Sequence, residues 1–146
     1  MSFNMEMDIN FYTVIVSIVA SLFGGWFSSF LQMRRWKQSE KFSFMWNFRL
    51  KIVEAEKLMW DTSSYRELNS PLNWLIVASQ DPRVNIDESF AESYSKAIIA
   101  GWRYLMESVE RGEDDPGIST SLLEKIEKEQ KNLDRIVLNK MKDLKV

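Results

Sequence analysis

An uncharged run from Ile9 to Met33 is the most prominent hydrophobic pattern in the chain, and three basic residues follow it closely, Arg34, Arg35 and Lys37. As a helix, these 25 residues would be about 37 Å long at ~1.5 Å per residue. The hydrocarbon core of a bilayer is about 30 Å thick, so a helix of this length can cross it with some tilt. The pattern therefore predicts a transmembrane helix over residues 9–33.

Two alternatives to a membrane anchor fit the pattern less well. A cleaved signal peptide begins with basic residues and has an apolar core of roughly 7–15 residues. Here Glu6 and Asp8 are acidic, and the apolar run is longer. A buried helix of a globular core rarely lacks every charge over such a length. We therefore expect a retained, single-pass anchor.

The position of the basic residues predicts the orientation of this anchor. Lys and Arg are enriched on the cytoplasmic side of membrane spans, and every Lys and Arg of this chain lies after Met33. Residues 1–8 are therefore predicted to form a short exterior N-terminus, and the chain from Arg34 onward to lie in the cytoplasm. Arg34, Arg35 and Lys37 would then contact the anionic lipid surface, at about 1 kcal/mol for each basic side chain.

Small side chains recur along the predicted span at intervals of four residues. Such ladders let helix backbones approach closely in lipid and favour helix association. We expect a homo-oligomer whose spans pair through these small residues. Two alternatives remain open, because Gly and Ser are common in membrane spans and a polar stripe can also line a narrow water path. The residues expected to associate are Ser17, Ser21, Gly24, Gly25 and Ser28.

The chemistry of the side chains argues against catalysis. The chain has no cysteine and no histidine, which excludes a disulfide framework, a thiolate nucleophile and the commonest metal ligand. No G-x-S-x-G elbow, Walker loop or H-E-x-x-H motif occurs. Residues 113–115 are acidic and would suit a divalent ion, but acids in a Pro-Gly loop are usually a solvated turn. The sequence thus predicts no enzyme, no cofactor and no metal site.

Charge is unevenly distributed after the span. Residues 34–53 carry six Lys or Arg and one Glu, whereas residues 54–118 carry thirteen Asp or Glu and six Lys or Arg. The first block suits the anionic inner leaflet, and the second would be repelled by it. No broad basic face is evident, so duplex nucleic acid is not an expected partner.

Residues 34–61 contain no Gly or Pro and predict a basic and aromatic helix next to the membrane. The strong helix formers of residues 53–59 favour this helix. The aromatic residues near its start suit either a core or a contact with lipid or a neighbouring subunit. A competing pattern is the strand-like alternation of Phe42, Phe44, Trp46, Phe48, Leu50 and Ile52.

Helix-start and helix-end signals divide residues 62–146, the predicted cytoplasmic α-helical domain, into three further helices. The expected helices and their signals are 71–79 with Ser70 and Pro71, 88–111 with Asp87 and Gly112, and 121–144 with the capping box Ser121 to Glu124. The first of these is apolar all round and is expected to be buried. The predicted fold is all-α, with one N-terminal transmembrane helix followed by a cytoplasmic bundle of about four helices.

One group of side chains has the chemistry of a ligand site. Arg103 stands between Trp102 and Tyr104 in the sequence, and aromatic faces and Arg are the groups that stack on and grip nucleotides. Arg83 would add a contact to phosphate. The predicted ligand-binding residues are therefore Arg83, Arg103 and Tyr104. The alternative is that Trp102 belongs to the core and Arg103 is an ordinary surface cation.

A span, a basic aromatic collar and an α-helical domain without catalytic residues follow one another along this chain. This layout resembles the small membrane effectors of bacterial antiphage systems, among them type III CRISPR effectors that bind a cyclic oligoadenylate. The resemblance covers the whole chain and is one of architecture. It implies a homo-oligomer in the bacterial inner (cell) membrane whose cytoplasmic domain senses a cyclic nucleotide and whose span disrupts the bilayer. The competing interpretation is a membrane-tethered scaffold or accessory subunit that recruits a protein partner.

Overall fold

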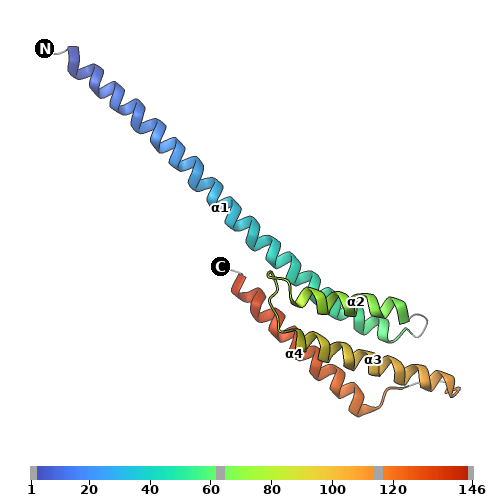
Figure 1. The fold of residues 1–146 in the computed structure, drawn as a ribbon. Coiled ribbons are helices and arrows are strands. Elements are labelled where there is room, and N and C mark those ends of the chain that lie inside the picture. The colour runs from blue at the N-terminus through green and yellow to red at the C-terminus, as the bar shows by residue number, and fades with distance from the viewer. Residues whose placement is uncertain (1–2, 62–64, 114–116, 145–146) are drawn as a thin grey trace. The chain divides into compact units, whose positions relative to one another are not determined.

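The computed structural model describes residues 3–61, 65–113 and 117–144, and for residues 3–12, 14 and 22 it describes the backbone alone. Within these ranges every regular element is a helix, as the sequence predicts (Figure 1). The chain divides into two compact units, Met1–Ser39 (the N-terminal unit) and Glu40–Val146 (the helical unit). The helices are α1, Phe3–Met59; α2, Tyr65–Ser79; α3, Glu88–Glu110; and α4, Thr120–Leu144.

The N-terminal unit consists of the first part of α1. Every described side chain from Ile15 to Lys37 is exposed, although most are apolar up to Met33. A stretch of this helix, with mean hydropathy 1.5, is long and apolar enough to cross a membrane by length and composition. The polar side chains in it can be satisfied locally, since the Ser21 hydroxyl donates to the Ile18 carbonyl at 3.1 Å. The long apolar helix predicted near the N-terminus is thus confirmed.

The segment from Phe42 to Ile52 is helical. This confirms the helix that the sequence favours, and the competing strand is wrong. Met45, Phe48 and Ile52 follow one another at three- and four-residue steps, and each is at most 1% exposed. A strand would have placed Trp46 on the same face as Phe48. Trp46 is instead 48% exposed, because a helix turns it away from the core.

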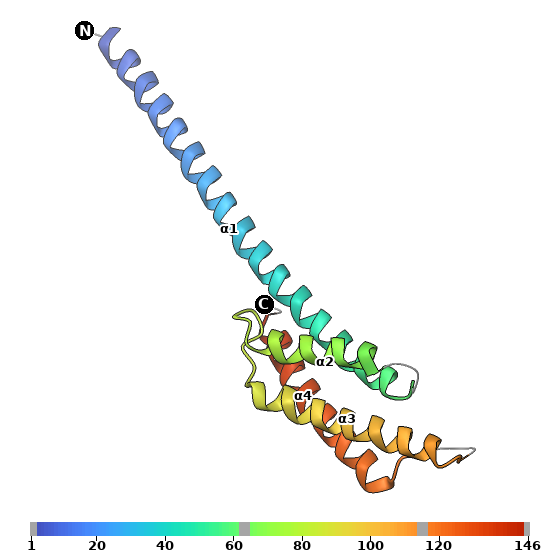
Figure 2. The same cartoon turned by 45° about the vertical axis from the view of Figure 1, so that its right-hand side comes forward.

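The helical unit packs around one apolar core. Both views show α2 beside the C-terminal part of α1 and α4 beside α3 (Figures 1 and 2). Fully burying one Leu or Ile side chain contributes roughly 1.5–3 kcal/mol, so this core is the main stabilising feature of the unit. All four helices contribute to it, with Phe48, Ile52 and Met59 from α1, Leu68, Leu72 and Leu75 from α2, Tyr94 and Ile98 from α3, and Ile126, Leu133 and Val137 from α4.

The start of α2 differs from its prediction. The helix begins at Tyr65, so Pro71 lies inside it and Ser70 is not its cap. Leu68 explains the extra turn, because it is completely buried one turn before Leu72 and extends the apolar stripe of the helix. The expectation that this helix is buried all round was also wrong, since Val77 is 73% exposed.

The ends of α3 agree with prediction, and the start of α4 does not. The Asp87 carboxylate accepts a hydrogen bond from the Ser89 amide at 3.0 Å, and Gly112 ends α3 in a left-handed conformation, φ 75°. In α4 the carbonyl of Ser119 already accepts from the amide of Leu123 at 3.0 Å. Ser121 therefore lies inside the first turn, and the capping box predicted there is wrong.

Two close contacts join α3 to the C-terminal part of α1. The buried Tyr94 hydroxyl donates to the Ile52 carbonyl at 2.6 Å. Burial, with a smaller contribution from the charge of Glu56, raises the pKa of Tyr94 well above its ordinary value. About two turns further along α3, a Cβ on Gly101 would lie only 2.6 Å from the Met59 sulfur. A side chain at position 101 would therefore fit only if the Met59 and Ile126 side chains shifted.

Candidate functional site

Arg83, the first predicted ligand residue, lies in the turn between α2 and α3, and each of its three guanidinium nitrogens already donates to a carboxylate. Its guanidinium makes two bonds to Asp81, Nε–Oδ1 at 2.9 Å and Nη2–Oδ2 at 2.8 Å, and a third to Glu40 Oε1 at 3.2 Å. It also lies over the ring of Phe44, 4.1 Å from the centroid. A phosphate here would have to compete with two carboxylates, so Arg83 serves mainly to tie this turn to α1.

Electrostatics support this structural role for Arg83. Its side-chain hydrogen bond is the main cause that lowers the pKa of Asp81 from 3.8 to about 2. The same carboxylate raises the pKa of Arg83, with Glu40 adding to the effect. Both groups therefore stay charged through the whole physiological range, so their attraction does not depend on pH there.

Arg103 and Tyr104 lie on α3, away from Arg83. Arg103 is fifteen residues beyond Glu88, the first residue of the helix, which places it about 22 Å along α3 at ~1.5 Å per residue. Its side chain is exposed and makes no ion pair with any other described residue, and Tyr104 is half-buried. Arg103 and Tyr104 are consecutive residues of α3, whose side chains diverge on a helix, and Arg83 lies in a different part of the unit. Ligand binding by these residues stays a prediction.

Trp102 packs on the core and on Tyr65, and no ring contact between it and Arg103 is present. It is half-buried, and its ring contacts that of Tyr65 at 5.1 Å between centroids. This is the arrangement that the alternative interpretation of the Trp-Arg-Tyr segment described. An acidic metal site gains no support either, because the described residues include no group of three potential ligands. Asp114 and Asp115, which were considered for that role, lie outside the described residues.

The residues predicted for span association and for lipid contact are exposed in the N-terminal unit. Ser17, Ser21, Gly24, Gly25 and Ser28 all lie on the surface of α1. A Cβ built on either glycine meets no other atom within 4 Å, so the backbone is open to a neighbour there. The basic residues after the span, Arg34, Arg35 and Lys37, are also exposed. Their association and lipid contacts stay predictions.

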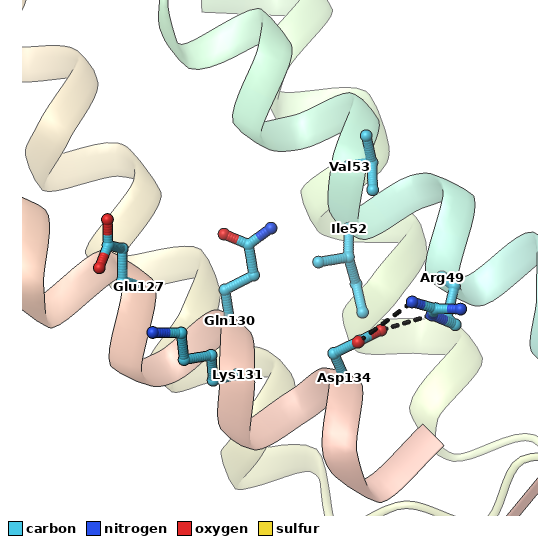
Figure 3. Close-up of a pocket in the computed structure, with 7 residues that line it drawn as sticks. All are labelled: Arg49, Ile52, Val53, Glu127, Gln130, Lys131 and Asp134. Carbon is cyan, nitrogen blue, oxygen red and sulfur yellow. Dashed lines mark hydrogen bonds and ion pairs between the residues drawn. The ribbon is translucent and has the colours of Figure 1, made fainter. Parts of the chain in front are cut away.

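Within the helical unit, a groove of about 360 Å³ runs between α1 and α4 (Figure 3). Arg49 bridges it at one end through two bonds to Asp134, Nε–Oδ1 at 2.5 Å and Nη2–Oδ2 at 3.2 Å. Gln130 donates to Glu56 across the same helices at 2.7 Å. Side chains of Ile52 and Val53 supply its apolar lining. The complete lining is Arg49, Ile52, Val53, Glu127, Gln130, Lys131 and Asp134.

An apolar stripe on α1 borders this groove and is not covered by the helical unit. Trp46, Leu50 and Val53 are 48%, 50% and 57% exposed, and they follow one another at steps of four and three residues. Val53 also lines the groove, and Arg49 lies over the Trp46 ring at 5.8 Å. We call these three residues the α1 seam. The sequence predicts a contact surface from the aromatic residues near Trp46, but that prediction does not include Leu50 and Val53. Their spacing of four and three residues from Trp46 is the sequence pattern that could have identified them.

Comparisons with protein families, with characterised proteins and with solved structures find no match to this chain. Neither the groove nor the seam holds a nucleophile next to a base. An apolar stripe on a helix beside a partly polar groove is instead the kind of surface on which another helix packs.

Proposed function

We propose that this protein is a membrane-anchored, non-catalytic protein that works by assembling with other protein chains. The observation that carries the proposal is the α1 seam. Large apolar side chains that stay half-exposed together on one helix mark interaction surfaces more often than isolated ones do. The groove beside the seam adds polar groups that can fix the position of a partner.

The anchor sets the place of this assembly. We propose a single span over residues 9–33 in the bacterial inner membrane, with residues 1–8 outside and the helical unit in the cytoplasm. The apolar character of the first part of α1 and the basic residues that follow it support this orientation.

A messenger-sensing membrane effector is the second candidate. Arg103 is an exposed cation without an ion pair to any other described residue, and it adjoins the half-buried Tyr104. This pair would supply one phosphate contact and one aromatic face to a cyclic oligonucleotide. Arg83 adds little, because its guanidinium is occupied.

Two measurements on the full-length chain test these proposals. An anchored chain stays in the membrane pellet after an alkaline wash, whereas recovery in the wash would refute the anchor. Purified chain is then titrated with cyclic oligoadenylates while its melting temperature is recorded. A ligand that binds only the folded state must stabilise it, so a rise that Arg103→Gln abolishes favours the effector, and no rise favours the assembly protein.

A further inference from the structure

We infer that the partner of the α1 seam is a second copy of this chain, paired with it in parallel and in register. Trp46, Leu50 and Val53 of one copy would pack against the same residues of the other. This inference rests on the proposed membrane anchor, because the anchor supplies the parallel orientation.

Within the helical unit, α1 is apolar on two sides. One stripe, Phe48, Ile52 and Ala55, is buried against the other helices of the unit. The seam repeats at the same four- and three-residue steps on the other side and remains half-exposed. A helix that is apolar on one stripe needs one neighbour, so a helix with two such stripes needs a second.

The spacing of the seam residues suits a helix as the neighbour. Apolar residues at alternating steps of four and three form the seam of two helices that wrap around each other at a small angle. Counted back along the sequence from Trp46, the same steps pass through Ser43, Ser39 and Trp36 and reach Gly25. Gly25, which we predict to bring spans together, therefore belongs to the same four-three series of positions as the seam.

The charges beside the seam favour a parallel copy as this neighbour. In a parallel pair with Leu50 at the a position of the heptad, residue 49 of one helix faces residue 54 of the other. For this seam those residues are Arg49 and Glu54, which carry opposite charges. An antiparallel pair would place equivalent positions, and hence like charges, against each other.

Both groups have bonding capacity left for this contact. The bonds from Arg49 to Asp134 use Nε and Nη2 and leave Nη1. The bond of Glu54 with Lys51 uses Oε2 and leaves Oε1. Lys57 is the next position of the four-three series, where two ammonium groups would face each other, so the seam ends at Val53.

A seam of three residues is short, and its strength therefore depends on the anchor. Two copies held in one membrane meet at a much higher effective concentration than free chains, so a modest interface is enough. The anchor also holds every copy at the same height and in the same direction. A symmetric pair then places each seam residue opposite its own counterpart.

Cysteine cross-linking in membranes tests the pairing. The chain has no cysteine, so each single substitution gives a unique thiol. In the inferred pair, Leu50→Cys faces its counterpart and should form a covalent dimer on oxidation or with a short bis-maleimide. Lys41→Cys is the matched control, because Lys41 is exposed on the same helix but lies nine residues, about 2.5 turns, away and so points to the opposite side. It should remain monomeric.

A second pair of variants tests the contact itself. Leu50→Glu should abolish cross-linking at Val53→Cys, because it places two carboxylates in the seam. Val77→Glu should leave that cross-link unchanged, since Val77 is a highly exposed apolar residue of α2. Equal cross-linking at positions 41 and 50, or cross-links only to other proteins, would overturn the inference.

The alkaline wash separates this failure from failure of the proposed function. A chain that stays in the pellet but shows no dimer at Leu50→Cys keeps its anchor and refutes the self-pairing. A chain released by the wash refutes the anchor and, with it, the parallel arrangement.

Discussion

Substitution of Gly101 by Ala probes a close contact of α3 with side chains of α1 and α4 in the helical unit. An added Cβ would lie 2.6 Å from the sulfur of Met59 and 2.7 Å from Cδ1 of Ile126. Both neighbours belong to the buried core, with Met59 at 0% and Ile126 at 2% exposure. The new methyl group can therefore fit only if packed side chains of α1 and α4 move.

Two opposing effects set the size of the change. Overfilling a well-packed core costs about 1–3 kcal/mol. Replacing Gly by Ala inside a helix recovers about 1 kcal/mol of helix propensity. We therefore expect Gly101→Ala to lower the free energy of unfolding by about 1 kcal/mol, with about 2 kcal/mol as the upper limit. For a domain of this size, each kcal/mol lowers the melting temperature by roughly 4–8 °C.

The assay is thermal unfolding of the purified chain in mild detergent, followed by near-ultraviolet circular dichroism. Ala100→Gly is the control for propensity, because Ala100 is the exposed neighbour of Gly101 on the same helix. Ile126→Val removes the Cδ1 atom that the new methyl group would meet. The double variant Gly101→Ala with Ile126→Val should be more stable than the sum of the single changes predicts, by roughly 0.5 kcal/mol or more.

If Gly101→Ala raises the stability by the full value of about 1 kcal/mol that Ala100→Gly loses, the three helices are not in close contact at Gly101. Strict additivity of the two substitutions would also show that Ile126 is not the obstacle.

Three further predictions concern single residues. Tyr94→Phe should lower the free energy of unfolding by about 0.5–1.5 kcal/mol through loss of the buried hydrogen bond. Because the pKa of Tyr94 is raised above 10.0, the wild-type chain should also lose stability as the pH rises above that value. An equal alkaline loss in Tyr94→Phe would show that Tyr94 is not the group responsible. Because the pKa of Asp81 is lowered from 3.8 to about 2, its stabilising effect should be complete above 3.8 and disappear as the pH falls toward 2, and Asp81→Asn should lack this acid step in equilibrium unfolding. If a cyclic oligonucleotide binds, Arg103→Gln should weaken it by about 1.5–3 kcal/mol in calorimetry, whereas Lys96→Gln, on the same helix, should have no effect.

Local signals predicted most of the helical boundaries because the physical cause of each boundary is local. Asp87 caps α3 through an amide two residues away, and Gly112 ends it by its own backbone conformation. The start of α2 could not be found in this way. Its additional turn is stabilised by burial of Leu68 against other helices, and this tertiary contact outweighs the Ser-Pro signal at Ser70 and Pro71.

The candidate ligand residues show a different limit. Sequence identifies the chemistry of a side chain but not the groups that meet it in space. Arg83 has the chemistry of a phosphate ligand, and its guanidinium is bonded to Asp81, two residues away, and to Glu40, 43 residues earlier in the chain. The proximity of Asp81 was visible in the sequence, whereas that of Glu40 required the fold.

The α1 seam was hidden for a reason that lies in the helix itself. Both apolar stripes of α1 repeat at steps of three and four residues, and their members interleave along the chain as Phe48, Leu50, Ile52 and Val53. Interleaving two helical stripes produces near-alternation, which is the pattern of a strand. The strand-like signal in this segment is thus the trace of a helix with two apolar faces. One face is covered by the helical unit, and the other provides the surface through which we propose that this protein assembles.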